Sequence, residues 1–112
     1  MESIAAVTAL SALAQSSRLE IFRYLVQQSP NASTPGDLAS ALSLPKATLS
    51  FHLKELTQAG LISGQQSGRR IFYSANIDAM RDLLDYLSEN CCQGNNCDLT
   101  PAAPRRQLGD IV

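Results

Sequence analysis

The sequence predicts a mainly α-helical domain that contains one small β-hairpin, and three observations lead to this prediction. Apolar residues recur at helical spacing through most of the first 60 positions, strand-like residues flank a turn after Gly60, and helical spacing resumes at Ile77. The chain has 112 residues, of which 45% are hydrophobic and 17% are charged. This length and composition allow one compact domain rather than several.

Membrane and secretory classes are not indicated. No apolar run approaches the roughly 18–20 residues that would cross a bilayer. Glu2 stands where a secretory signal would carry positive charge. We therefore expect a cytoplasmic protein with no membrane partner.

Charge is nearly balanced but unevenly distributed. Nine Lys or Arg residues against ten Asp or Glu residues give a formal net charge of −1. Segment 46–70 carries four basic residues against one acidic residue, whereas segment 78–98 carries five acidic residues against one basic residue. The middle of the chain is thus the part suited to a polyanionic partner.

The first helix is expected to be almost entirely apolar. Ile4, Val7, Leu10 and Ala14 recur at helical spacing, and the helix should end near Gln15. A helix with so little polar surface should be buried on more than one side. In a small protein, we expect a second subunit to bury the side that its own domain leaves exposed.

Two further helices follow. Ser17 and Glu20 have the spacing of a capping box that would begin the second helix, which should stop before Pro30. Thr34 and Pro35 form an N-cap followed by proline, which predicts a short third helix through residue 42.

A fourth helix is expected over residues 45–59. Ser43 and Pro45 repeat the arrangement of cap and proline, and Gly60 supplies the left-handed residue that commonly follows a helix. The inward face is leucine-rich: Leu49, Leu53 and Leu56. Two helices separated by about three residues are a helix-turn-helix pattern.

The hairpin and last helix complete the domain. A strand should begin at residues 61–62, turn at Ser67 and Gly68, and return through residues 71–73. In the last helix, apolar residues are separated by 3, 4, 3 and 4 positions, which is the coiled-coil average: Ile77, Met80, Leu84, Leu87 and Cys91. We expect a winged helix-turn-helix domain over residues 1–92, dimerising through its first and last helices, and a tail over residues 93–112.

Three runs of this sequence, 47–56 (ATLSFHLKEL), 59–62 (AGLI) and 68–73 (GRRIFY), carry a family resemblance. Together they resemble the ArsR/SmtB family of bacterial metalloregulatory repressors, and the likeness extends over residues 6–97. The resemblance implies a repressor that binds double-stranded operator DNA and is not an enzyme. One reading helix buries too little surface for operator specificity, so we expect a homodimer on an inverted repeat.

The outward face of the fourth helix and the tip of the hairpin are the expected DNA-binding surface, because a capped helix fits the major groove and basic hairpin residues can contact phosphate. The alternatives are a His52 that is hydrogen-bonded within its own domain, a Phe51 that packs against the wing or a partner, and arginines that are ordinary solvated charges. The predicted set is Lys46, Ala47, Thr48, Ser50, Phe51, His52, Lys54, Arg69 and Arg70.

Three cysteines, Cys91, Cys92 and Cys97, fall within seven positions. An odd, clustered set is a poor disulfide framework and indicates soft-metal or redox chemistry. Three thiolates without an obvious fourth ligand suit an ion that binds three sulfurs in a pyramid, such as As(III) or Sb(III). The family resemblance also implies this chemistry, since one arsenical-responsive group has a vicinal pair and a third cysteine after the last helix.

Other uses of the cysteines remain open. Zinc or cadmium could complete four-coordination with Asp98 or water, and copper(I) accepts two or three soft ligands. A Cys92–Cys97 or Cys91–Cys97 disulfide would make a redox-sensing repressor of the same fold. A small thiol arsenate reductase is less favoured, because no anion-cradling glycine loop is present. We expect As(III), with Sb(III) or methylarsenite as further inducers, and no organic cofactor.

Overall fold

The computed structural model describes residues 1–94 and contains the predicted order of elements. Four helices come first: α1 (Ser3–Leu13), α2 (Ser16–Gln28), α3 (Pro35–Leu42) and α4 (Lys46–Gln58). The hairpin strands β1 (Ile62–Ser67) and β2 (Arg70–Ala75) are followed by α5 (Ile77–Ser88) and the short 3-10 helix η1 (Cys91–Gly94). This is the winged helix-turn-helix arrangement, and the predicted fold class is confirmed.

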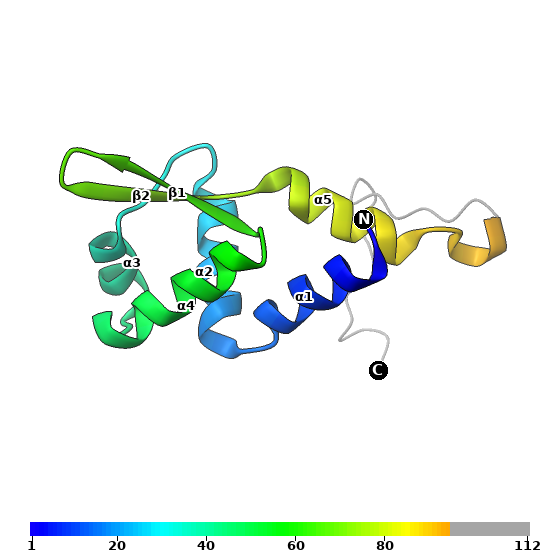
Figure 1. Cartoon of the computed structure of the whole chain (residues 1–112), viewed down its shortest axis with the longest axis horizontal. Coiled ribbons are helices and arrows are strands. Elements are labelled where there is room, and N and C mark those ends of the chain that lie inside the picture. The colour runs from blue at the N-terminus through cyan, green and yellow to red at the C-terminus, as the bar shows by residue number, and fades with distance from the viewer. Residues whose placement is uncertain (95–112) are drawn as a thin grey trace, which may run out of the picture.

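The elements divide between two ends of the molecule. α3, α4 and the hairpin lie at one end, and α1 lies beside α5 at the other (Figure 1). Within the described residues, no helix is long and apolar enough to cross a membrane.

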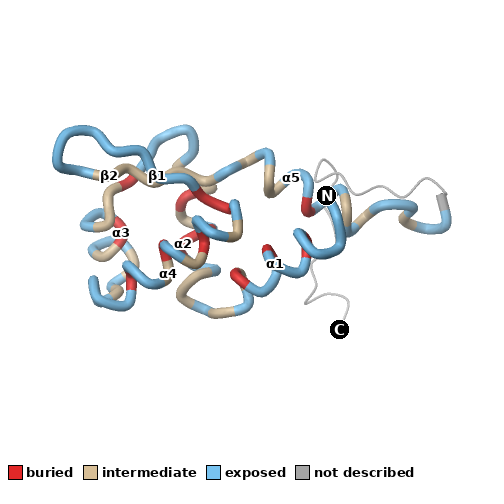
Figure 2. Tube along the Cα trace, viewed as in Figure 1, coloured by how far each residue is buried: buried red, intermediate tan, exposed pale blue. Residues whose placement is uncertain are grey.

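The core lies where α2 and α4 cross between these two ends (Figure 2). Ile21 and Leu25 of α2 pack in one cluster with the three leucines that were predicted to face inward from α4. Alanines occupy the inward face of α1, so this helix approaches its neighbours closely: Ala6, Ala9 and Ala12.

The start of α2 differs from the prediction. α1 ends at Leu13, and the side chain of Gln15 is the N-cap that accepts a hydrogen bond from the Arg18 backbone N–H at 2.9 Å. The capping box predicted at Ser17 and Glu20 is therefore wrong, because Ser17 already lies inside the helix.

The third helix begins as predicted. Thr34 and Asp37 form a reciprocal capping box with two hydrogen bonds of 3.1 Å, and Pro35 occupies the first turn. The predicted repeat of a side-chain N-cap followed by proline is not found at the start of α4. Ser43 instead ends α3 with a left-handed backbone, and Pro45 is the N-cap of α4 without a side-chain hydrogen bond.

The hairpin is antiparallel, with Ile62 opposite Ala75 and Ser67 opposite Arg70. Its two-residue loop is therefore Gly68 and Arg69, one position beyond the predicted turn, because Ser67 still pairs. Gly68 has a φ of +64°, which favours glycine. An isolated bridge between Ser33 and Tyr73 attaches the loop after α2 to the hairpin.

The last helix ends earlier than predicted. α5 stops at Ser88, so Cys91 lies beyond it rather than at the end of its apolar seam. The physical reason is that the C-cap Glu89 has an extended backbone, with a ψ of +130°, and Asn90 after it is left-handed, so the α-helix cannot continue to Cys91. Leu83 is the buried side chain of α5, and Met80 and Tyr86, partly buried, pack against the same core.

Candidate functional site

Helix α4 presents its outward face to solvent because its leucines anchor the opposite face. Leu49, Leu53 and Leu56 are at most 2% exposed. Phe51 is 55% exposed, as the helical spacing predicted, and His52 is half-buried. The other reading-helix residues of the predicted set are exposed: Lys46, Ala47, Thr48, Ser50 and Lys54.

The first turn of α4 keeps its amides available. The N-cap Pro45 makes no side-chain hydrogen bond, so the first backbone N–H groups of the helix have no side-chain cap. The Thr48 hydroxyl donates to the Pro45 carbonyl at 3.1 Å, and the Ser50 hydroxyl donates to the Lys46 carbonyl at 3.4 Å. These two hydroxyls still have acceptor lone pairs, and the amides can bind an anion.

His52 has a partner within its own domain. The guanidinium Nη1 of Arg18 lies 3.3 Å from His52 Nδ1, and the Phe51 ring contacts the imidazole edge-on with centroids 5.7 Å apart. Partial burial, and secondly the charge of Arg18, lower the pKa of His52 below its usual 6.5, while Glu55 acts in the opposite direction. Sequence reasoning anticipated an intradomain bond but missed Arg18, which lies 34 positions away.

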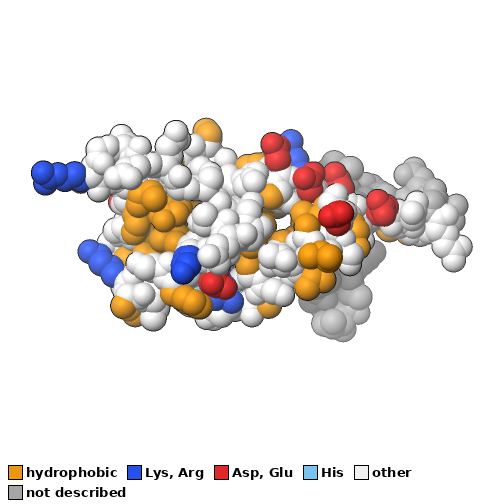
Figure 3. Space-filling model, in the orientation of Figure 1, with side chains coloured by type: hydrophobic (Ala, Val, Ile, Leu, Met, Phe, Trp, Pro, Cys, Tyr) orange, Lys and Arg blue, Asp and Glu red, His pale blue; other side chains and the backbone are white. Residues whose placement is uncertain are grey.

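The wing brings its arginines close to α3 and α4. Arg69 and Arg70 are exposed at the hairpin tip, and with Lys46 they line a cavity of about 600 Å³ beside the start of α3. Most of the blue side chains in Figure 3 lie on the half of the molecule that holds α4 and the wing, and most of the red ones lie along α5. The basic end of the molecule is thus the end that carries α4.

An apolar surface covers the opposite end. Five large apolar side chains of α1 and α5 face solvent there: Ile4 at 80%, Val7 at 58%, Leu10 at 42%, Leu84 at 56% and Leu87 at 57% exposed. We call these five residues the α1/α5 apolar surface. Exposed aliphatic side chains gathered on adjacent helices are typical of a protein–protein interface.

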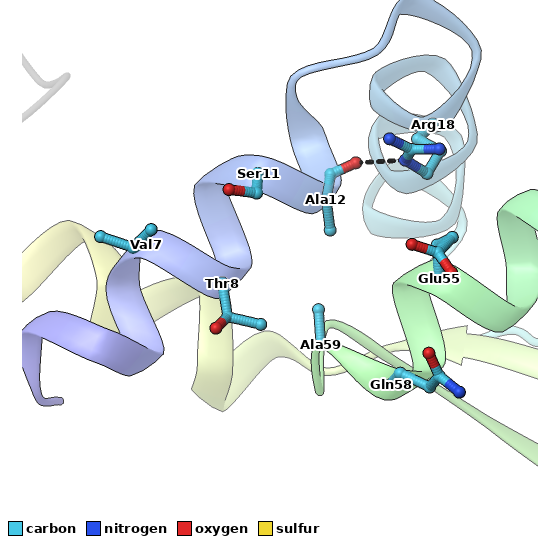
Figure 4. A pocket seen from close by; sticks show the side chains of 8 residues that line it. All are labelled: Val7, Thr8, Ser11, Ala12, Arg18, Glu55, Gln58 and Ala59. Atoms are coloured by element: carbon cyan, nitrogen blue, oxygen red, sulfur yellow. Dashed lines mark hydrogen bonds between the residues drawn. The ribbon is translucent and has the colours of Figure 1, made fainter.

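A second cavity, of about 460 Å³, lies between α1 and α4 (Figure 4). Val7, Thr8 and Ser11 line it from α1, and Glu55 and Gln58 line it from α4. Arg18 closes one side, where its Nε donates to the Ala12 carbonyl at 2.6 Å.

The two adjacent cysteines approach one another after α5. The Sγ atoms of Cys91 and Cys92 lie 3.5 Å apart, because the left-handed backbone of Cys92 turns the chain. Cys91 is half-buried and is a free thiol, whereas Cys92 is disulfide-bonded. Cys97 and the predicted alternative ligand Asp98 lie outside the described residues. Residues 1–94 alone contain no group of three or more metal-binding side chains.

Comparison with known proteins agrees with this architecture. A family model described as a helix-turn-helix domain matches residues 13–65. The transcriptional activator HlyU of Vibrio cholerae is 31% identical over 93 residues, which are 83% of this chain and 83% of that protein. The arsenical resistance operon repressor of Bacillus subtilis is 35% identical over 81 residues, which are 72% of this chain and 73% of that protein.

Solved structures extend the comparison. Reduced HlyU has a TM-score of 0.62 at 30% identity, covering 81% of this chain and 93% of that one. A homodimeric winged helix-turn-helix domain from Mycobacterium bovis, a possible ArsR-family regulator, has a TM-score of 0.63 at 22% identity, covering 84% and 87%. HlyU is described as an activator of transcription and the Bacillus subtilis protein as a repressor. The chain belongs to the ArsR family of winged helix-turn-helix transcriptional regulators.

Proposed function

We propose that this regulator is a homodimeric repressor that holds an inverted-repeat operator and releases it when As(III) binds Cys91, Cys92 and Cys97. The observation that carries the arsenic assignment is the 3.5 Å separation of the Cys91 and Cys92 sulfurs. The likeness to an arsenical resistance operon repressor supports the same assignment.

The sulfur separation lets two donors reach one thiophilic ion. Two sulfurs bound to one tetrahedral ion at about 2.3 Å, the usual Zn–S length, lie roughly 3.8 Å apart, and the 3.5 Å between Cys91 and Cys92 is close to that span. The choice of As(III) over a tetrahedral ion rests on the number of cysteines, which supply three sulfurs without an obvious fourth ligand. Three thiols would displace the three hydroxyls of arsenious acid as water, and the disulfide at Cys92 must first be reduced.

DNA binding is assigned to α4 and the wing. Lys46, Lys54, Arg69 and Arg70 would neutralise phosphates, and the uncapped amides of α4 would add backbone donors. Ala47, Thr48, Ser50, Phe51 and His52 would face the base edges of the major groove. The exposed Phe51 has no hydrogen-bonding group and would pack on thymine methyl groups.

The homodimer is assigned to the α1/α5 apolar surface. A twofold axis through this surface would place one α4 at each end of the dimer, as two successive half-sites require. The homodimeric state of the related Mycobacterium bovis domain supports this assembly.

The position of the cysteines next to α5 would explain how arsenic binding releases the operator. Cys91 comes three residues after the end of α5, and Leu87 of the apolar surface lies within the last turn of α5. An ion that binds all three sulfurs would restrain the segment that follows α5 and shift α5, which contributes to the proposed dimer interface. A coupling free energy of about 1–3 kcal/mol, or 5- to 150-fold in affinity, is enough, and the operator must weaken arsenic binding by the same factor.

The test measures fluorescence anisotropy of the operator with reduced protein, with and without arsenite. Arsenite should lower operator affinity, Cys91→Ser and Cys97→Ser should bind DNA normally but lose the response, and Ser88→Ala serves as a nearby control that keeps it. An unchanged arsenite response in the Cys97→Ser protein contradicts the three-sulfur site.

A redox-responsive repressor is the second candidate, because Cys92 is disulfide-bonded while Cys91 is a free thiol. The relative HlyU has also been solved in a form called reduced. Here two thiols would lose two electrons and two protons to an oxidant such as a peroxide. Operator release by peroxide, reversed by a thiol reductant and absent with arsenite, would favour this candidate over As(III).

A further inference from the structure

We propose that Arg18, a residue of α2 outside the reading helix, positions His52 so that its Nε2–H is presented as a hydrogen-bond donor to the operator. This inference rests on the proposed function, because it assumes that α4 reads DNA. Its chemical partner on DNA is a hydrogen-bond acceptor, either a phosphate oxygen or the N7 or O6 of a purine.

Both the backbone and the side chain of Arg18 are hydrogen-bonded to neighbouring residues. Its backbone N–H donates to the Gln15 side chain at 2.9 Å, and its Nε donates to the Ala12 carbonyl at the end of α1 at 2.6 Å. The guanidinium is planar, so the Nε bond also restricts the direction of Nη1, which meets His52 Nδ1 at 3.3 Å. Figure 4 shows Arg18 turned toward Ala12, with Glu55 of α4 on the neighbouring side.

This contact determines which imidazole nitrogen carries the proton. A guanidinium has only donors, so His52 Nδ1 must be the acceptor of the 3.3 Å bond. A neutral imidazole that accepts at Nδ1 carries its hydrogen on Nε2. The Arg18 contact is therefore compatible with only one neutral tautomer.

The protonated nitrogen is left accessible. His52 Nε2 lies on the opposite edge of the ring from the arginine, and within residues 1–94 the only hydrogen bond of the His52 side chain is the one at Nδ1. No buried side-chain nitrogen or oxygen in the described residues is without a partner, so Nε2 must be reached by solvent. A donor in that position, on a half-buried ring in the reading helix, can meet an acceptor on DNA.

The charges around His52 keep this donor neutral. Arg18 from α2 opposes a second positive charge on the ring, partial burial acts in the same direction, and Glu55 from α4 acts against both. The net effect is a pKa below the usual 6.5. His52 thus remains in the single-tautomer form near neutral pH.

The first experiment is an NMR titration of the free protein, in which one histidine per chain makes the signal unambiguous. The wild-type ring should carry its proton on Nε2 and titrate below pH 6.5. Arg18→Gln should raise the pKa of His52, and Arg18→Lys should raise it less, since lysine keeps the positive charge. Arg23→Gln, which changes an exposed arginine of the same helix, should leave the pKa of His52 unchanged. An Nδ1-protonated wild-type ring, or a pKa that is equal in wild type and Arg18→Gln, overturns the proposal.

The second experiment measures operator affinity of the same variants at fixed salt. Arg18→Gln should weaken operator binding about 2- to 12-fold more than Arg23→Gln, because this is the change in affinity that the loss of one hydrogen bond typically causes. A loss confined to particular operator sequences identifies a purine acceptor, and an equal loss on all sequences identifies phosphate. If Arg18→Gln and Arg23→Gln weaken operator binding equally, the proposed role of Arg18 is overturned. No binding by the wild-type protein refutes the proposed function instead, and the NMR result then still decides the Arg18–His52 contact.

Discussion

Leu87→Ala is expected to weaken the homodimer strongly without harming the fold of the protomer. Leu87 is 57% exposed in the single chain, so its removal costs little core packing. If the dimer covers this residue fully, the substitution removes three carbon groups that would otherwise become buried there.

The size of the effect follows from the exposed fraction. Burying a CH₂ group contributes about 0.8 kcal/mol, so three groups, 57% of whose surface remains to be covered, contribute about 1.4 kcal/mol. A twofold interface contains the residue twice, which gives about 2.7 kcal/mol. This corresponds to about a 100-fold rise in the dimer dissociation constant.

Sedimentation velocity over a dilution series measures this constant directly. Leu19→Ala is the matched control, because Leu19 is a 43% exposed leucine on α2, outside the α1/α5 apolar surface. Circular dichroism should show the same helix content in all three proteins. A dissociation constant that is unchanged by Leu87→Ala, or raised equally by Leu19→Ala, would refute the assignment of the interface.

Three further predictions concern DNA binding, pH and helix capping. Arg69→Ala and Arg70→Ala should each reduce the slope of log affinity against log salt by about 0.9, as measured by operator anisotropy at several NaCl concentrations; an unchanged slope would show that the wing does not contact phosphate. Because folding lowers the pKa of His52, the stability contributed by its neutral form should be present above pH 6.5 and lost as the pH falls below it. The free energies of unfolding in urea of wild type and His52→Asn should therefore converge in acid. Thr34→Ala should cost about 0.5–2 kcal/mol of unfolding free energy in urea through loss of the capping box, whereas Ser16→Ala, which removes no cap bond, should cost less.

Local chemistry in the sequence determined the order of elements. Thr34 and Pro35 begin α3, and Gly60, with a φ of +78°, follows α4 because only glycine takes that conformation freely. The leucine spacing of α4 also determined which residues face outward, because a helix has a fixed period. These features depend on neighbours within a few residues, so the sequence alone was sufficient.

The tertiary structure decided what depends on distant neighbours. The partner of His52 is an arginine 34 positions earlier, and no local pattern indicates that pair. The end of α5 was misplaced because an apolar seam can continue in sequence after the extended Glu89 and the left-handed Asn90 have ended the helix. The approach of the Cys91 and Cys92 sulfurs likewise follows from the backbone angle of Cys92, since spacing along the chain sets how far apart two side chains can be but not how the backbone between them turns.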